Sequence, residues 1–139
     1  METIKRTLKS GDSAKGDISK LAFELLNGVT KVHLNHLRIS GPGSFAGHKA
    51  MNEFYDAIGD MADRLIEEYQ GLTEKLLTFP TSYDFPTMSN AKECLVYLRT
   101  LYNTIDSFQE SCQYSEINNQ LDEVKSLINS TKYKLLFLA

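Results

Sequence analysis

The sequence has no tryptophan, and only three prolines and two cysteines among its 139 residues. Pro42, Pro80 and Pro86 lie in segments that look like connections, so long stretches remain free for uninterrupted helices. No apolar run reaches the length of about 18 residues that a membrane-spanning helix needs. No apolar segment of a secretory signal follows the first residues. We therefore expect a cytoplasmic protein, or one inside a virus particle, without membrane contact.

The cysteine spacing and the net charge argue against disulfide-bonded, zinc-binding and nucleic-acid-binding proteins. Cys94 and Cys112 stand eighteen residues apart without C-x-x-C spacing, which favours buried thiols over a disulfide or a zinc site. The net charge of -3 argues against nucleic-acid binding by the domain as a whole.

The N-terminal segment differs from the rest of the chain. Residues 1–20 hold five basic residues against three acidic ones, and residues 10–16 are rich in turn formers. We interpret residues 1–16 as a flexible, mildly basic tail and residues 17–139 as one domain. DNA binding through this tail is one hypothesis, although each phosphate contact is weak and depends on salt.

Helical periodicity dominates the domain, and no sustained alternation of apolar and polar residues indicates strands. Four helices are predicted, at about 18–39, 44–70, 90–110 and 116–138. Asp17 and Ser44 are expected N-caps, Gly71 is an expected helix end, and Asn90 with Glu93 has capping-box spacing. The short links favour an antiparallel four-helix bundle. The longer link from 79 to 88 is either a short connection, with or without a helical piece, or a crossover. A coiled-coil assembly is the alternative architecture.

All three histidines, His33, His36 and His48, fall within sixteen residues, and two of them flank the predicted tight turn at Pro42. Neutral imidazole is a common ligand of iron and zinc, so this cluster is a candidate half of a metal site. The second predicted helix adds Asp63 and Glu67, which project side by side one turn apart.

A single chain cannot unite these groups on one metal ion. His48 and Asp63 lie on one broad face of their helix, but fifteen residues of helix span about 22 Å. A two-fold axis across the middle of this helix would bring His48 of one copy to Asp63 and Glu67 of another. Without such a dimer, His36 is a turn residue or a helix end, and the two acids belong to a solvated face.

The segment from His36 to His48, HLRISGPGSFAGH, resembles the first ferroxidase half-motif of the Dps mini-ferritins. In that family a histidine is followed twelve residues later by a second one, then by an aspartate after fifteen residues and a glutamate after four more. His36, His48, Asp63 and Glu67 match these four positions in type and spacing. The similarity covers about residues 32–71, while the later helices agree only in length and pattern.

The resemblance implies a ferritin-like bundle that binds iron at a site shared between subunits. It also implies oxidation of Fe(II) by peroxide or oxygen and storage of iron in a homo-oligomeric shell, a dodecamer in the family. His36 and His48 would come from one subunit, and Asp63 and Glu67 from the other. His33, one turn before His36, is expected either to support the ligands or only to pack.

The sequence departs from the Dps pattern at two positions. Leu37 replaces a customary tryptophan, and Asn52 replaces an acidic residue that is often a further ligand. A missing carboxylate weakens the binding of a second iron ion, so the site is expected to be mononuclear or dinuclear. These departures fit a divergent member, such as a virus-encoded one. They also support a structural or assembly protein without efficient ferroxidase activity.

Overall fold

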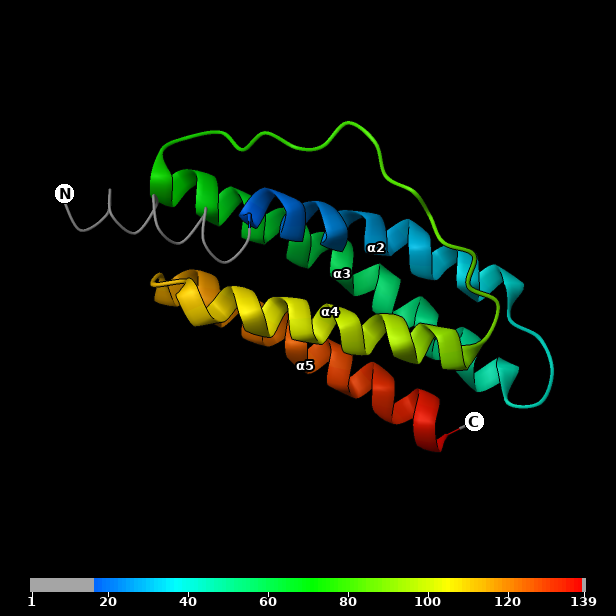
Figure 1. The fold of residues 1–139 in the computed structure, drawn as a ribbon. Coiled ribbons are helices and arrows are strands. Elements are labelled where there is room, and N and C mark those ends of the chain that lie inside the picture. The colour runs from blue at the N-terminus through cyan, green and yellow to red at the C-terminus, as the bar shows by residue number, and fades with distance from the viewer. Residues whose placement is uncertain (1–16, 139) are drawn as a thin grey trace.

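The computed structural model describes residues 17–138, and within them the chain forms four α-helices and no strand. They are α2 (Ile18–Arg38), α3 (Ser44–Thr73), α4 (Ala91–Ser111) and α5 (Ser115–Phe137), shown in Figure 1. The all-α prediction is confirmed, and every helix end lies within three residues of its predicted position. The predicted tail at residues 1–16 lies outside the described residues.

The helices form an antiparallel bundle with one long crossover. α2 and α3 form a hairpin, and the segment 74–90 then returns along the length of the bundle (Figure 1). α4 therefore starts at the end where α3 starts, and α5 runs back beside it. Each neighbouring pair, α2 with α3, α3 with α5, α5 with α4 and α4 with α2, is antiparallel. The longer link is therefore the crossover that the sequence left as one alternative.

Two predicted helix starts are confirmed by their hydrogen bonds. The Asp17 carboxylate accepts a bond of 2.8 Å from the Ser19 backbone N–H, which caps α2. Asn90 Oδ1 accepts a bond of 2.9 Å from the Glu93 N–H, and the Glu93 carboxylate accepts one of 2.9 Å from the Ser89 N–H. These bonds satisfy N–H groups that have no partner inside the helix.

Two predictions at the ends of α3 are wrong. Ser44 is the first helical residue rather than the cap, and Gly43 precedes it with a φ of 78°. Gly71 does not end the helix, because α3 continues to Thr73 and Glu74 adopts the left-handed conformation with a φ of 57°. Gly71 is exposed, and one glycine costs a helix only about 1 kcal/mol, so helical hydrogen bonding continues through it.

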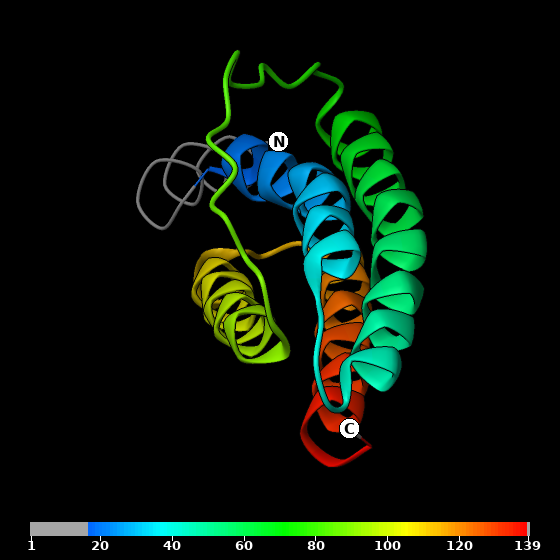
Figure 2. The same ribbon diagram turned by 90° about the vertical axis from the view of Figure 1, so that its right-hand side faces the viewer.

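The core is formed by one apolar stripe from each helix. α3 packs closely against both α2 and α5, and α4 lies against α5 while its junction with α2 is looser (Figure 2). The fully buried large side chains of this core include Leu25, Val32, Phe54, Ile58, Leu98, Ile105, Leu121 and Ile128.

Aromatic side chains hold the crossover against α2. The Phe23 ring lies 6.5 Å from the Phe79 ring and 6.0 Å from the Tyr83 ring, measured between centroids. The Tyr83 hydroxyl donates to the Glu24 carboxylate, and Met88 is buried near the start of α4. Residues 74–90 contain no helical piece. No helix among residues 17–138 is long and apolar enough to cross a membrane.

Candidate functional site

Two glycines shape the turn between α2 and α3. Gly41 and Gly43 have backbone φ angles of 91° and 78°, which residues with a Cβ rarely adopt. Gly47 then lets the turn approach the bundle, since a Cβ there would lie 2.8 Å from Ile39 Cδ1. The chain therefore reverses tightly, and the end of α2 meets the start of α3.

The turn places His36 and His48 in direct contact. Their rings stack with centroids 3.5 Å apart and an angle of 26° between the planes. His36 Nδ1 lies 2.8 Å from the His48 carbonyl oxygen, and His48 Nδ1 lies 3.1 Å from the His36 carbonyl oxygen. The two residues are thus joined by a reciprocal pair of side-chain to backbone hydrogen bonds.

These bonds select a tautomer for both rings. A carbonyl oxygen only accepts, so each Nδ1 must carry the proton that it donates. In the neutral ring each Nε2 then keeps a lone pair, which is the form in which histidine binds a metal ion. His36 is 7% exposed and His48 is exposed, so the pair extends from the bundle to its surface.

Two more rings complete an aromatic group, here called the ring cluster: His33, His36, His48 and Tyr55. The His33 ring stacks on Tyr55 with centroids 4.4 Å apart, and the His36 ring meets Tyr55 edge-on at 5.3 Å. His33 therefore supports the cluster by packing. Tyr55 was not predicted as part of the site, although it follows His48 by seven residues, two helical turns along one face of α3.

Asn52 is held in a network beside this cluster. Its Oδ1 accepts a bond of 2.6 Å from the Tyr55 hydroxyl, and its Nδ2 donates a bond of 3.0 Å to the Asp56 carboxylate. Partial burial, with Asp56 nearby, raises the pKa of the Tyr55 hydroxyl. The position where Dps proteins often have an acid is therefore occupied by an amide that orients Tyr55.

The predicted acidic ligands lie elsewhere on α3. Asp63 and Glu67 are exposed, and Asp63 is about 22 Å along the helix from His48. Among residues 17–138, no group of three or more histidine, cysteine, aspartate or glutamate side chains is close enough to hold a metal ion. The chain thus brings together His36 and His48, and does not bring Asp63 and Glu67 to them.

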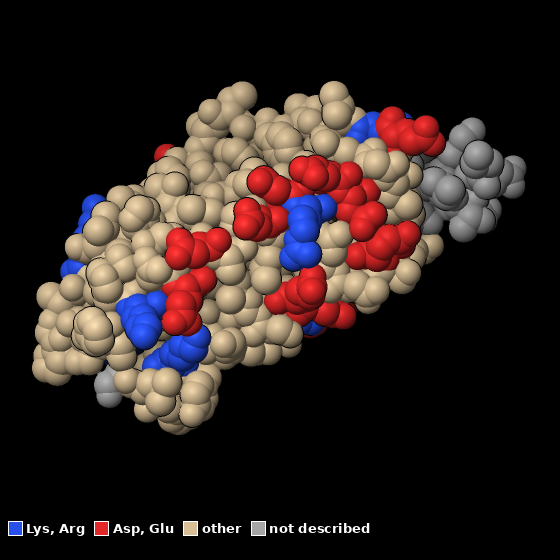
Figure 3. Space-filling model, turned by 180° about the vertical axis from the view of Figure 1, so that it is seen from behind, with Lys and Arg blue, Asp and Glu red and all other residues tan. Residues whose placement is uncertain are grey.

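Acidic side chains gather on one face of the molecule, which Figure 3 shows from behind with few basic residues among them. α3 is a major source of exposed acid, with Glu53, Asp56, Asp60, Asp63 and Glu67. Residues 1–16 hold four basic and two acidic residues, so the described part is more acidic than the chain as a whole. This surface is unsuited to bind the phosphate backbone of DNA.

Two exposed apolar side chains adjoin the histidine pair. Leu37 directly follows His36 and is 66% exposed, and Phe45, one turn before His48, is 80% exposed. Phe45 and His48 also line a small surface hollow with Ile39 and Ser44. A large apolar group beside a polar site is typical of an interface with another molecule.

Comparison with known proteins identifies a family without a known role. The model of a family of unknown function, DUF5856, matches residues 40–135. These residues include His48, Asp63 and Glu67, and they begin after His36. No curated protein and no solved structure matches the chain.

Proposed function

We propose that this chain, which belongs to the family of unknown function DUF5856, binds iron at a histidine and carboxylate site shared by two copies of itself. The proposed activity is that of a Dps-like mini-ferritin, namely oxidation of Fe(II) and storage of iron in a homo-oligomeric shell. The observation that carries the proposal is the pairing of His36 and His48, whose Nδ1 atoms both lie at carbonyl oxygens.

The chemistry of this pair suits a transition metal. Hydrogen bonds to Nδ1 orient each imidazole before a metal arrives, and they leave Nε2 as the ligand atom. Two imidazoles and two carboxylates form a mixed nitrogen and oxygen donor set that Fe(II) accepts. Open coordination positions would admit an oxidant.

The carboxylates must come from a second copy. In an antiparallel pair of α3 helices related by a two-fold axis, His48 of one copy lies at the level of Asp63 and Glu67 of the other. Asp63 and Glu67 are exposed and available for such a contact. Leu37 and Phe45 provide the apolar area beside the histidines that a dimer would bury.

In the proposed reaction Fe(II) is the substrate. Each Fe(II) ion loses one electron, and a peroxide molecule takes up two electrons and two protons to leave as two water molecules. The protein holds Fe(II) through His36 and His48, and Asp63 and Glu67 balance the positive charge. Storage of the product needs a closed shell, and the dodecamer of Dps proteins is the expected assembly.

A mixing experiment tests the shared site. His48→Ala and Asp63→Ala should each abolish the peroxide-dependent oxidation of Fe(II) above the rate in buffer. When the two variants are mixed and reassembled, each mixed dimer regains one site with an intact histidine pair and intact acids. Because random pairing makes about half of the dimers mixed, activity should return to about one quarter of the native rate.

The control is Asp60→Ala, which removes another exposed acid of α3 and should oxidise Fe(II) at the native rate. Variants that stay inactive after verified subunit exchange would contradict a site shared between copies. Native activity in His48→Ala would contradict the assignment of the metal ligands.

A structural role is the second candidate. The reciprocal hydrogen bonds of His36 and His48 close the turn between α2 and α3, and such a clamp needs no metal. Asn52 and Leu37, where the Dps pattern has an acid and a tryptophan, are consistent with an assembly protein that lacks ferroxidase activity. A stable oligomer that neither binds nor oxidises Fe(II) would favour this role.

A further inference from the structure

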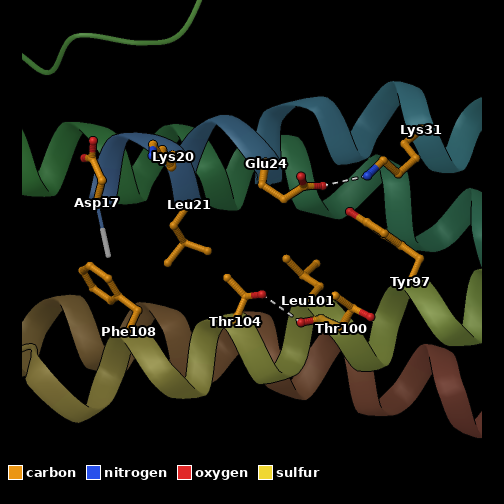
Figure 4. A pocket seen from close by; sticks show the side chains of 10 residues that line it. All are labelled: Asp17, Lys20, Leu21, Glu24, Lys31, Tyr97, Thr100, Leu101, Thr104 and Phe108. Carbon is orange, nitrogen blue, oxygen red and sulfur yellow. Dashed lines mark hydrogen bonds and ion pairs between the residues drawn. The ribbon is translucent and has the colours of Figure 1, made fainter. Parts of the chain in front are cut away.

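A second candidate site lies away from the histidines, between α2 and α4. It is a cavity of about 380 Å³ that opens along the junction of the two helices (Figure 4). Most of its exposed wall is apolar surface, although several of the lining residues are charged or polar. They are Asp17, Lys20, Leu21, Glu24, Lys31, Tyr97, Thr100, Leu101, Thr104 and Phe108. Pockets for small molecules commonly measure about 300–1,000 Å³, so the cavity has the size of such a pocket.

Charged residues on α2 explain why this junction stays open. Lys20, Glu24 and Lys31 stand four and seven residues apart, so they lie along one side of α2, which faces α4 (Figure 4). If α4 packed closely against this side of α2, the charged groups there would lose their contact with water, which costs free energy unless each is paired. The cavity therefore follows from the sequence of α2.

One end of the cavity is closed by a neutralised ion pair. Lys31 Nζ lies 3.0 Å from Glu24 Oε2, and it also sits over the rings of Tyr97 and Tyr83, at 4.6 Å and 4.9 Å from their centroids. The Tyr83 hydroxyl from the crossover donates to the same carboxylate. The charges of Glu24 and Lys31 thus interact with each other and with the two tyrosines rather than with a ligand.

Tyr97 leaves a polar atom unpaired at this end. Its hydroxyl is buried and has no hydrogen-bond partner, and it points toward the Glu24 and Lys31 pair (Figure 4). Burial raises the pKa of this hydroxyl well above its usual value, so it keeps its proton. A buried donor without an acceptor is costly. The hydroxyl packs against Gly28, so a turn of the Tyr97 ring toward the cavity would let an acceptor on a bound molecule remove that cost.

The charges along the cavity balance. Asp17 and Glu24 are opposed by Lys20 and Lys31, so the lining carries no net charge. Leu21, Leu101 and Phe108 form its apolar wall. An uncharged molecule is therefore favoured over an anion or a cation.

We propose that the cavity between α2 and α4 binds a small uncharged molecule with an apolar body and one hydrogen-bond acceptor, such as a ketone. The Tyr97 hydroxyl donates to the acceptor, and Leu21, Leu101 and Phe108 contact the apolar body.

The test uses Prodan, a neutral naphthalene ketone whose fluorescence shifts to the blue when it leaves water. Titration of the full chain should give a saturable blue shift. Thr104→Trp, which fills the cavity from an exposed position, should abolish saturation, whereas Ser107→Trp, exposed on α4 outside the cavity, should not. No saturable shift with the native chain would overturn the proposal, as would native binding in folded Thr104→Trp.

A second pair of variants tests the hydrogen bond. Tyr97→Phe keeps the ring and removes the donor, and should weaken Prodan binding by up to about tenfold. Tyr102→Phe removes a hydroxyl from a ring that packs under Lys125 outside the cavity, and should leave binding unchanged. Equal binding in both variants would remove Tyr97 from the site. Tighter binding of the anion anilinonaphthalene sulfonate than of Prodan would contradict an uncharged ligand.

Discussion

The rings of His36 and His48 stack with their centroids 3.5 Å apart, and each Nδ1 lies at the carbonyl oxygen of the other residue. The arrangement fastens the end of α2 to the start of α3. It also leaves one nitrogen of each ring free, so the same contact serves either a turn clamp or a metal site.

Metal-linked stability separates these two roles. Zn(II) does not undergo redox chemistry and accepts the same ligands, so it should raise the stability of the native protein. At about 100 times the dissociation constant the gain is about 2.7 kcal/mol. His48→Ala and Asp63→Ala should lose this gain and Asp60→Ala should keep it, as measured by thermal unfolding with and without Zn(II). If Zn(II) stabilised the native protein and all three variants equally, the His36 and His48 pair would be a turn clamp and not a metal site.

The assembly should depend on the apolar side chains beside the histidines. Light scattering of the native protein should show a particle well above the chain mass of 15.7 kDa. Leu37→Ser combined with Phe45→Ser should shift the particle to smaller mass, because the buried apolar area of the interface is lost. Leu76→Ser is the control, since Leu76 is 84% exposed beyond the far end of α3. A native protein that is a monomer would exclude the shared metal site.

The position of the Tyr97 ring should depend on the absence of a side chain at Gly28. A Cβ at position 28 would lie 2.6 Å from the Tyr97 hydroxyl oxygen. Gly28→Ala should therefore destabilise the protein by about 1 kcal/mol in spite of the better helix propensity of alanine. Adding Tyr97→Phe should restore that loss, which urea denaturation of the single and double variants would measure. A Gly28→Ala protein as stable as the native one would show that the Tyr97 ring can move aside.

Cys94 should be inert as long as the protein is folded. Burial raises the pKa of its thiol to about 12, so almost no thiolate exists near neutral pH. In a Cys112→Ser variant, a thiol reagent at pH 8 should label Cys94 only after denaturation. Rapid labelling of the native variant would indicate that α4 opens readily. Both cysteines are free in the structure, as predicted, although Cys112 is only half-buried.

DNA binding remains a prediction for residues 1–16, which lie outside the described residues. Deletion of these residues should abolish any gel shift of DNA at low salt, because acidic residues outnumber basic ones in the rest of the chain. The full chain should lose its own shift as salt increases. A shift that survives the deletion would place the contact on the bundle.

Local sequence signals were sufficient for the four helices and most of their ends. Asp17 and Asn90 cap as predicted because a capping bond joins neighbouring residues. The prediction that Gly71 ends its helix was wrong, because helical hydrogen bonding continues through one exposed glycine. The spacing of His48, Asp63 and Glu67 on a rigid helix also made clear, without coordinates, that one chain cannot assemble them.

The contacts between distant segments came only from the folded chain. Tyr83 from the crossover, Lys31 from α2 and Tyr97 from α4 meet at one end of the cavity, and no periodicity relates their positions. The stacking of His36 on His48 and the bonds to Nδ1 likewise depend on how tightly the turn closes. Helix periodicity and capping act over a few residues, whereas these contacts depend on how whole helices pack, which no local pattern specifies.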